Sequence, residues 1–284
     1  MTATLDRPET GPRLTTAGIL RSEWVKLVTL RSTWWCLALI AGMTAGVPVL
    51  IALALGSPGG QPGTDTLDVG SHTWAMANTV IVSFTVLIAA VLGCLVITGE
   101  YGTGMIRSSL TAAPGRLSTV FAKAFVIGLV VFVVGALALT AGALASAPIL
   151  ASGGLLIDPG DAREWLALLG AAGYPALVAV LSVGVGTLVR NSAGAIAAVL
   201  GLLLVVPTVL QLVAMLLRVD WMLDVMQFLP SALGNTMASF VADPAADVAE
   251  GPLTLAPWQA ALAMAGWAGA ALAGGAAAIA RRDV

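Results

Sequence analysis

The sequence is poor in charge, and its few charged residues are absent from six long stretches. Only 10% of the 284 residues are Asp, Glu, Lys or Arg, whereas soluble domains carry about 25%. The stretches without any of these four residues are 32–64, 69–99, 124–157, 165–189, 191–217 and 251–280. A helix needs about 20 mostly apolar residues to cross a bilayer, and each stretch is longer than that. A soluble globular protein is therefore excluded, and the chain is predicted to span a membrane several times.

Residues that carry catalysis or ion coupling are also scarce. The single His, His72, falls in a predicted outer loop and is interpreted as an ordinary exposed residue. The two Cys, Cys36 and Cys94, lie in apolar stretches and form no disulfide or metal motif. No Gly-Lys dipeptide occurs, which excludes a Walker A phosphate loop. Because the predicted spans contain no charged residue, ion-coupled transport has little support. No catalytic, cofactor or metal site is expected on this chain.

What the chain has in abundance is continuous hydrophobic sequence. Hydrophobic residues make up 58% of the chain, in long runs rather than the short alternating segments of a β-barrel. Inside lipid every backbone polar group must be satisfied within the chain, so these runs predict helices. The predicted fold is an all-α polytopic membrane protein with six transmembrane helices. The predicted spans are 34–55, 74–97, 124–147, 165–189, 194–217 and 257–280.

The basic residues predict that both termini lie in the cytoplasm. In that arrangement 11 of the 13 Lys and Arg lie inside, and only Arg163 and Arg218 lie outside. Ten of the 15 acidic residues then fall outside. The polar residues 1–16 are predicted to be a disordered cytoplasmic tail. The remainder, 33–284, is predicted to be the transmembrane domain.

Residues 17–32 are predicted to form an amphipathic helix in the membrane interface. At 100° per residue the apolar side chains gather on one face, with Trp at the depth of the lipid headgroups and basic residues toward anionic lipid. The residues assigned to this helix are Leu20, Trp24, Lys26, Leu27 and Arg31. The alternative is a simple cytoplasmic extension of the first span.

Residues 99–116 are the longest predicted cytoplasmic connection between spans. Glycines allow the chain to reverse, and 105–112 are expected to form a short helix ended by Pro114. Glu100 is the only acidic residue in such a connection, and its charge can be solvated or paired with Arg107 or Arg116. The segment is interpreted either as a helix-capping turn or as a docking surface for a cytoplasmic partner. A phosphate-binding loop is a weaker alternative.

Residues 225–242 are uncharged and fairly apolar but are interrupted by helix-breaking residues. The interruptions are Pro230, Gly234 and Asn235. The segment is predicted to form two short helices that enter the outer leaflet and return, packed against protein. A seventh span is the alternative, and it would move Arg281 and Arg282 outside.

Small residues recur at helical spacing within two of the predicted spans. They are Gly42 and Gly46 in the first span, and Gly266, Ala270 and Gly274 in the last. Such residues let helices approach closely. They are interpreted as packing positions first and as dimerisation positions second.

Three stretches resemble the permeases of type-2 ABC exporters, particularly the actinobacterial forms. They are Ser-Glu-Trp-Val-Lys-Leu at 22–27 followed by Thr-Leu-Arg-Ser at 29–32, Gly-Glu-Tyr-Gly-Thr-Gly-Met-Ile-Arg at 99–107 followed by Ala-Pro-Gly-Arg at 113–116, and Leu-Pro-Ser-Ala-Leu-Gly-Asn at 229–235. The family often has a basic residue after the Glu-Tyr pair, where this chain has Gly102.

The resemblance implies a role for each of these cytoplasmic and outer elements. The helix at 17–32 would be the connecting helix, and 225–242 the re-entrant helices near the exit. The connection at 99–116 would hold the coupling helix that docks on a separate ATP-binding subunit. The residues assigned to docking are Glu100, Tyr101, Gly102, Gly104, Met105, Ile106, Arg107 and Leu110.

The resemblance also implies a function and a set of partners. Two permease copies, identical or paralogous, would combine with two ABC ATP-binding subunits that hold ATP and Mg. The complex would export a small hydrophobic or amphipathic compound, such as a drug, antibiotic, lipid or peptide, across the bacterial cytoplasmic membrane. Membrane lipid is an expected partner and nucleic acid is not. The alternatives are a secondary, ion-coupled transporter and a membrane scaffold or sensor without transport activity.

Overall fold

The computed structural model describes residues 15–55, 67–102, 116–218, 220–239 and 255–281. The regular elements in these ranges are all helices. Six helical segments are long and apolar enough to cross a membrane, and each contains one predicted span. They are Arg31–Leu55, Gly70–Gly102, Ser118–Ser152, Ala162–Val189, Ser192–Leu217 and Pro257–Ala280. The predicted all-α, six-span fold is confirmed, whereas its orientation in the membrane stays a prediction.

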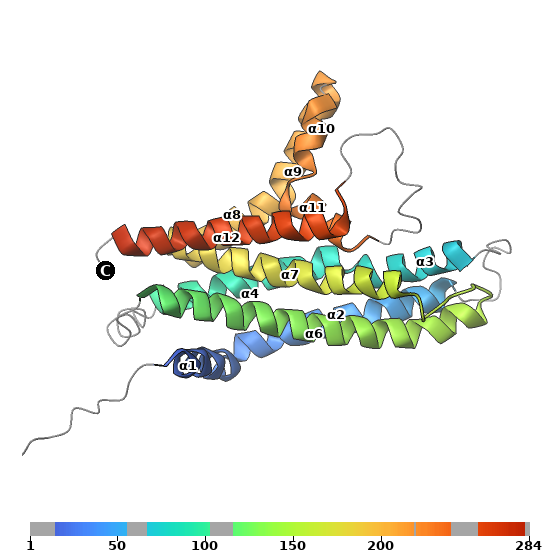
Figure 1. Cartoon of the computed structure of the whole chain (residues 1–284), viewed down its shortest axis with the longest axis horizontal. Helices are drawn as coiled ribbons and strands as arrows, with labels where there is room; N and C mark the ends of the chain where they lie inside the picture. The colour runs from blue at the N-terminus through green and yellow to red at the C-terminus, as the bar shows by residue number, and fades with distance from the viewer. Residues whose placement is uncertain (1–14, 56–66, 103–115, 219, 240–254, 282–284) are drawn as a thin grey trace, which may run out of the picture.

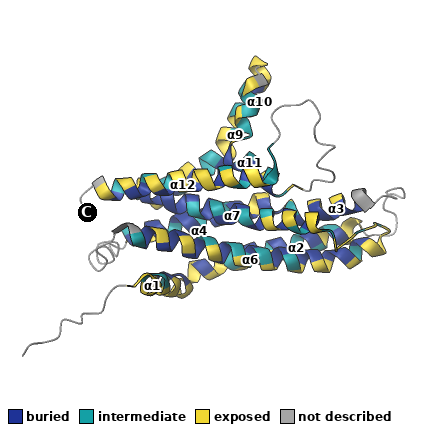
Figure 2. Ribbon diagram, in the orientation of Figure 1, coloured by how far each residue is buried: buried dark blue, intermediate teal, exposed yellow. Residues whose placement is uncertain are grey.

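Five long helices lie side by side along the long axis of the molecule (Figure 1). They are α2 (Arg31–Leu55), α4 (Val82–Gly102), α6 (Arg116–Ser152), α7 (Ala162–Val189) and α12 (Pro257–Arg281). Helix α7 is central, because it packs against α4, α6 and α12. Figure 2 shows buried residues where the helices meet and exposed residues on the outer faces.

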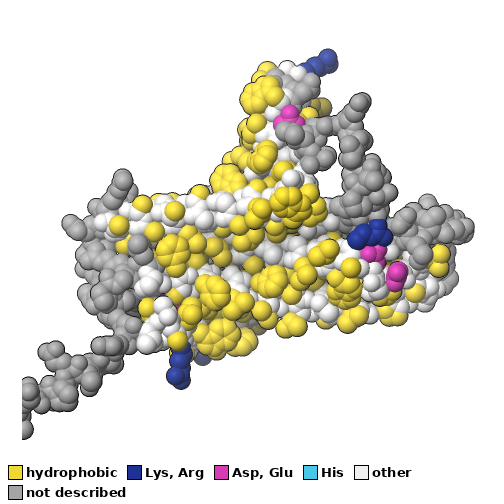
Figure 3. All heavy atoms as spheres, in the orientation of Figure 1, with side chains coloured by type: hydrophobic (Ala, Val, Ile, Leu, Met, Phe, Trp, Pro, Cys, Tyr) yellow, Lys and Arg dark blue, Asp and Glu magenta, His cyan; other side chains and the backbone are white. Residues whose placement is uncertain are grey.

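The outer surface of the bundle is largely apolar, as a bilayer requires. Leu50, Leu137 and Leu262 are each about two-thirds exposed. In Figure 3 hydrophobic side chains cover the middle of the bundle, and charged side chains lie toward the ends of helices. Lipid is the solvent that such a surface fits, since water would have to surround many exposed apolar groups.

Two of the spans are interrupted in ways that composition did not predict. The second consists of α3 (Leu67–Thr79) and α4, which are separated by residues 80–81. The fifth consists of α8 (Ser192–Leu200), a π-helical turn at Gly201–Val205, and α9 (Val206–Leu217). Figure 1 shows α9 projecting away from the bundle beyond that turn.

The predicted re-entrant segment contains the end of α10 (Asp220–Met226) and α11 (Pro230–Met237). Pro230 takes the first position of α11, where its missing N–H costs no helical hydrogen bond. Leu233 and Gly234 are buried, and a Cβ at Gly234 would lie 2.3 Å from the Tyr174 ring. Asn235 is exposed. The segment therefore packs against protein, while its entry into the outer leaflet stays a prediction.

The small residues selected from the sequence do not mark the tightest contacts between helices. A Cβ added at Gly42, Gly46 or Gly266 would meet nothing within 4 Å. Close approaches occur instead at other glycines, among them Gly184 of α7, where a Cβ would lie 2.4 Å from the carbonyl carbon of Ala271 in α12. Glycine allows these two backbones to touch.

Helix α7 begins with a side-chain cap that can be tested. The Asp161 carboxylate accepts a hydrogen bond from the Arg163 backbone N–H at 2.9 Å, and the Arg163 guanidinium lies 2.7 Å away. These hydrogen bonds from Arg163 hold the pKa of Asp161 below its usual value. Ionised Asp161 therefore stabilises the folded state at any pH above the unfolded-state pKa of this residue. That contribution is lost as the pH falls through its lower folded-state pKa.

We expect Asp161→Ala to lower the free energy of unfolding by about 1 kcal/mol, because an orphan N–H at the helix start loses its acceptor. Asp161→Asn should retain most of that stability, since Asn also caps helices. Unfolding in mixed detergent micelles at neutral pH checks both variants. Equal losses would show that the cap hydrogen bond contributes little.

Candidate functional site at the α1 end

Helix α1 (Thr16–Thr29) lies across one end of the bundle, where it packs against α6 and α2 and reaches the last turn of α4 through Lys26 and Glu100. Figure 1 shows α1 nearly end-on, whereas α2 runs along the bundle. The break falls at Leu30, whose backbone is extended with φ −82° and ψ 122°. Helix α1 is thus a separate element and not an extension of the first span. We call this end of the molecule the α1 end.

One face of α1 is buried and the other is exposed. Glu23 and Leu27 are buried against the bundle, while Trp24 is half-exposed. Trp34 and Trp35, at the start of α2, are 59% and 73% exposed. Tryptophan is enriched at the membrane–water interface, so these rings favour an interfacial position for α1.

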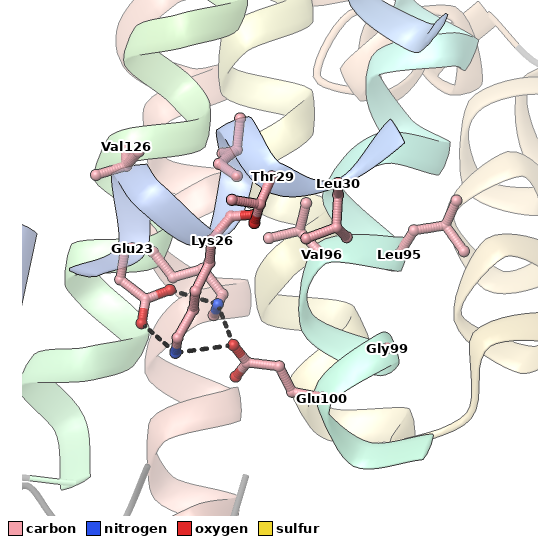
Figure 4. A pocket seen from close by; sticks show the side chains of 11 residues that line it. Glu23, Lys26, Thr29, Leu30, Leu95, Val96, Gly99, Glu100 and Val126 are labelled. Carbon is pink, nitrogen blue, oxygen red and sulfur yellow. Dashed lines mark hydrogen bonds and ion pairs between the residues drawn. The ribbon is translucent and has the colours of Figure 1, made fainter. Parts of the chain in front are cut away.

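Four charged side chains meet where α1, α4 and α6 come together (Figure 4). Lys123 Nζ of α6 donates to Glu23 Oε2 of α1 at 2.5 Å and to Glu100 Oε1 of α4 at 2.8 Å. Lys26 Nζ of α1 donates to Glu23 Oε1 at 2.8 Å and to Glu100 Oε1 at 3.1 Å. We call Glu23, Lys26, Glu100 and Lys123 the charge cluster.

The charge cluster is mostly removed from solvent. The side chains of Glu23, Lys123 and Glu100 are 2%, 3% and 7% exposed, and that of Lys26 is 28% exposed. Burial of unpaired charges is costly, but two ammonium groups here balance two carboxylates. Partial burial by itself lowers the pKa of Lys26, but the hydrogen bond to Glu23 and the charges of Glu100 and Glu23 outweigh it. The pKa of Lys26 therefore lies above its ordinary value of 10.5.

The structure places the predicted docking residues in different surroundings. Glu100 is 6% exposed and forms ion pairs with Lys26 and Lys123, whereas its predicted pairing with Arg107 or Arg116 involves side chains outside the described residues. The Lys26 ammonium contacts the Glu23 and Glu100 carboxylates, a role that the prediction of basic residues facing lipid headgroups did not include. Arg107 and the other predicted docking residues from Gly104 to Leu110 lie outside the described residues.

The last turn of α4 is also held to the end of α7. Tyr101 is half-buried, and the Arg190 guanidinium carbon lies 5.6 Å from the centre of its ring. This distance is typical of a cation–π contact. Gly102, the next residue, is exposed. Glu100 and Tyr101 therefore fasten α4 to its neighbours immediately before the segment 103–115.

A cavity of about 340 Å³ lies between α1 and the ends of α4 and α6. Figure 4 shows it from close by. Its lining combines the charge cluster with mainly apolar side chains. The other lining residues are Leu27, Thr29, Leu30, Leu95, Val96, Gly99 and Val126. We call this cavity the α1 cleft.

The comparison with known families fits this architecture. Residues 17–284 match the family described as ABC-2 family transporter protein. The chain belongs to the ABC-2 transporter family. No curated protein matches it. Family membership makes the chain a multi-pass membrane component of a transporter and implies, in general terms, an ABC ATP-binding partner. The resemblance deduced from the three sequence stretches is confirmed.

The opposite end of this ABC-2 permease contains a buried acid, one of the ten acidic residues predicted to lie outside. Glu164 lies in the first turn of α7 and is 1% exposed. The positive end of the α7 helix dipole and the Ser71 hydroxyl, which hydrogen-bonds the carboxyl group, favour an acid at this position. No group of three metal-binding side chains occurs among the described residues.

The residues that sequence reasoning missed at the α1 end are Glu23 and Lys123. In the sequence, Glu23 is part of the stretch at 22–27, and Lys123 is one of the 11 Lys and Arg predicted to lie inside. One local signal was available, because Glu23 and Lys26 are three positions apart and form an ion pair on the same helix face. Nothing local indicates that Lys123, a hundred residues later, joins them.

Proposed function

We propose that this ABC-2 permease is the membrane subunit of an ATP-driven exporter in the bacterial cytoplasmic membrane. A separate ATP-binding subunit, which holds ATP and Mg, docks at the α1 end. A second permease copy, identical or paralogous, completes the translocation path. The absence of a Gly-Lys dipeptide and of charged residues from the middle of the spans supports an energy source outside this chain.

The observation that carries the docking proposal is the charge cluster. Segment 103–115 joins the end of α4 to the start of α6, and the cluster links both helices to α1. A force on 103–115 therefore acts on three elements that are held together by buried ion pairs. Such a connected unit suits the transmission of a conformational change, because it moves as one body.

The proposed substrate is a small hydrophobic or amphipathic compound, which includes drugs, antibiotics, lipids and peptides. The spans offer apolar side chains, Gly and hydroxyl groups along their middle. A path without charged groups suits a substrate that needs no charged partner inside the membrane.

We expect replacement of 105–110 by a Gly-Ser linker of equal length to reduce ATPase stimulation and transport about tenfold or more. The linker replaces the segment predicted to dock and does not change the sequence of the described helices. The measurement is the ATPase rate of the partner subunit, with and without permease, in reconstituted vesicles.

A matched control replaces 58–63, in the connection between the first two spans, by the same linker and should leave stimulation unchanged. Full stimulation by the 105–110 variant would refute docking through this segment. Transport driven by an ion gradient without ATP would instead support the ion-coupled alternative.

A further inference from the structure

The α1 cleft has two parts with different chemistry. Its walls are mainly apolar and come from α1, from Leu30 at the α1–α2 break, and from α4 and α6, which contribute Leu95 and Val126. Its polar part is the charge cluster, of which Lys26 is the most exposed member. At about 340 Å³ the cleft is near the lower end of the range for small-molecule sites, about 300 to 1,000 Å³.

We infer that the α1 cleft binds a zwitterionic phospholipid of the leaflet in which α1 lies, with part of one acyl chain between the apolar walls. The inference rests on an interfacial position for α1, which the exposed Trp24, Trp34 and Trp35 favour. At that depth the apolar walls face acyl chains and the charge cluster faces headgroups. A phospholipid, which has a polar headgroup above its acyl chains, therefore fits both parts of the cleft.

The charges of the cluster select the type of headgroup. Glu23, Lys26, Glu100 and Lys123 sum to zero net charge, and three of the four are nearly buried. A headgroup with a net charge would add an unbalanced charge beside them in a region of low dielectric. A zwitterionic headgroup adds none, since its phosphate can approach Lys26 while its ammonium can approach Glu100. The ion pairs from Lys26 and Lys123 both reach Glu100 Oε1 (Figure 4), which leaves Oε2 for a further donor as far as the described residues are concerned.

A second groove on the same protein lacks this selectivity and serves as an internal reference. It has about the same volume, 330 Å³, and is lined by α6 and α7 residues without any charged side chain, including Phe125, Leu129 and Leu177. Acyl chains can occupy it, but nothing in it distinguishes headgroups. Labelling there should depend on lipid concentration alone.

The cleft can be narrowed by a substitution at a position where a Cβ has open surroundings. Gly99 lines the cleft, and a Cβ added there would meet nothing within 4 Å. Gly99→Leu therefore projects a side chain into the space that the acyl chain would occupy. Gly42→Leu is the matched control, because Gly42 has equally open surroundings and does not line the cleft. Val96→Phe narrows the cleft from a second position on α4, so an effect shared by both variants is not due to a defect specific to Gly99→Leu.

The test uses the full chain in vesicles of phosphatidylethanolamine and phosphatidylglycerol, with a phosphatidylethanolamine that carries a photoreactive acyl chain. Cross-linked peptides are mapped by mass spectrometry. We expect labelling at 95–96 and 27–30, and we expect Gly99→Leu and Val96→Phe to reduce it about fivefold or more while Gly42→Leu does not. At the α1 cleft, unlabelled phosphatidylethanolamine should compete with the probe at least about fivefold better than phosphatidylglycerol does. At the second groove, which contains Phe125, the two lipids should compete equally well.

Labelling of the cleft that both closing variants leave unchanged would overturn the inference, as would better competition by phosphatidylglycerol. Stronger competition by a transported compound than by phosphatidylethanolamine would assign the cleft to substrate instead. The labelling assay contains neither ATP nor the ATP-binding subunit. A negative result would therefore reject the lipid site without bearing on the proposed exporter function.

Discussion

Lys123→Met is expected to lower the free energy of unfolding by about 3 kcal/mol, the lower end of the range for breaking a buried ion pair. Lys123 contacts both carboxylates of the charge cluster, and its side chain is 3% exposed. Without it, Glu23 and Glu100 stay buried with Lys26 as their one remaining partner in the cluster. Water cannot readily replace the lost ammonium, so the penalty is that of a partly uncompensated buried charge.

Lys26→Met is the matched control because it removes the same side chain from the same cluster at a more exposed position. The Lys26 side chain is 28% exposed, so solvent screens its contacts with the carboxylates. The expected loss is below about 1 kcal/mol. Unfolding by a denaturing detergent in mixed micelles measures both values.

A double variant isolates the charge balance from the packing of the lysine stem. Glu23→Gln combined with Lys123→Met removes one charge of each sign, so about half or more of the stability lost in Lys123→Met should return. Equal losses in Lys123→Met and Lys26→Met would contradict a cluster centred on Lys123. An unchanged loss in the double variant would show that the lysine stabilises through its packing.

The membrane spans could be predicted from sequence because their cause is local. A run of residues without charge, longer than the bilayer is thick, predicts a span wherever it occurs. The separate α1 was predictable for a similar reason, since its apolar face repeats with the helical period. Each prediction needed only neighbours in the chain.

The charge cluster could not be predicted in that way because its members are distant in the sequence. The Lys26–Glu100 pair joins positions 74 residues apart, and the Lys123–Glu23 pair joins positions 100 apart. Local rules assign each of these residues to water or to lipid headgroups. Only the crossing of α1 over α4 and α6 brings opposite charges together and shields them from solvent.

The glycines also show that local sequence does not predict contacts between distant helices. Spacing identified Gly42 and Gly46 as a close-packing pair, yet both have open surroundings within the chain. Spacing shows that two glycines share a helix face but not which way that face points. The rotation of α7 about its own axis decides that Gly184 meets α12, and this rotation is set by the whole bundle.

Gly184→Ala is expected to lower the free energy of unfolding by about 3 kcal/mol, the upper end of the usual cost of overpacking. The new methyl group would lie 2.4 Å from the Ala271 carbonyl carbon and 2.6 Å from the Leu272 nitrogen. Both are backbone atoms, so no change of rotamer can relieve the contact. Helix α12 would have to move away from α7, with loss of packing along that interface. Gly269→Ala in α12 is the control; its Cβ meets nothing within 4 Å, so it should be neutral or stabilising by up to about 1 kcal/mol.

A second pair of variants separates a backbone clash from a side-chain clash. A Cβ at Gly128 would lie 2.7 Å from Val180 Cγ2, and no backbone atom is nearer than 3.8 Å. Val180→Ala should therefore restore much of the stability lost in Gly128→Ala, because it removes the opposing methyl group. Leu272→Ala should not rescue Gly184→Ala, since the obstructing atoms there belong to the backbone. Rescue of Gly184→Ala by Leu272→Ala would show that side chains set the distance between α7 and α12. It would contradict the prediction that backbone atoms obstruct the new methyl group.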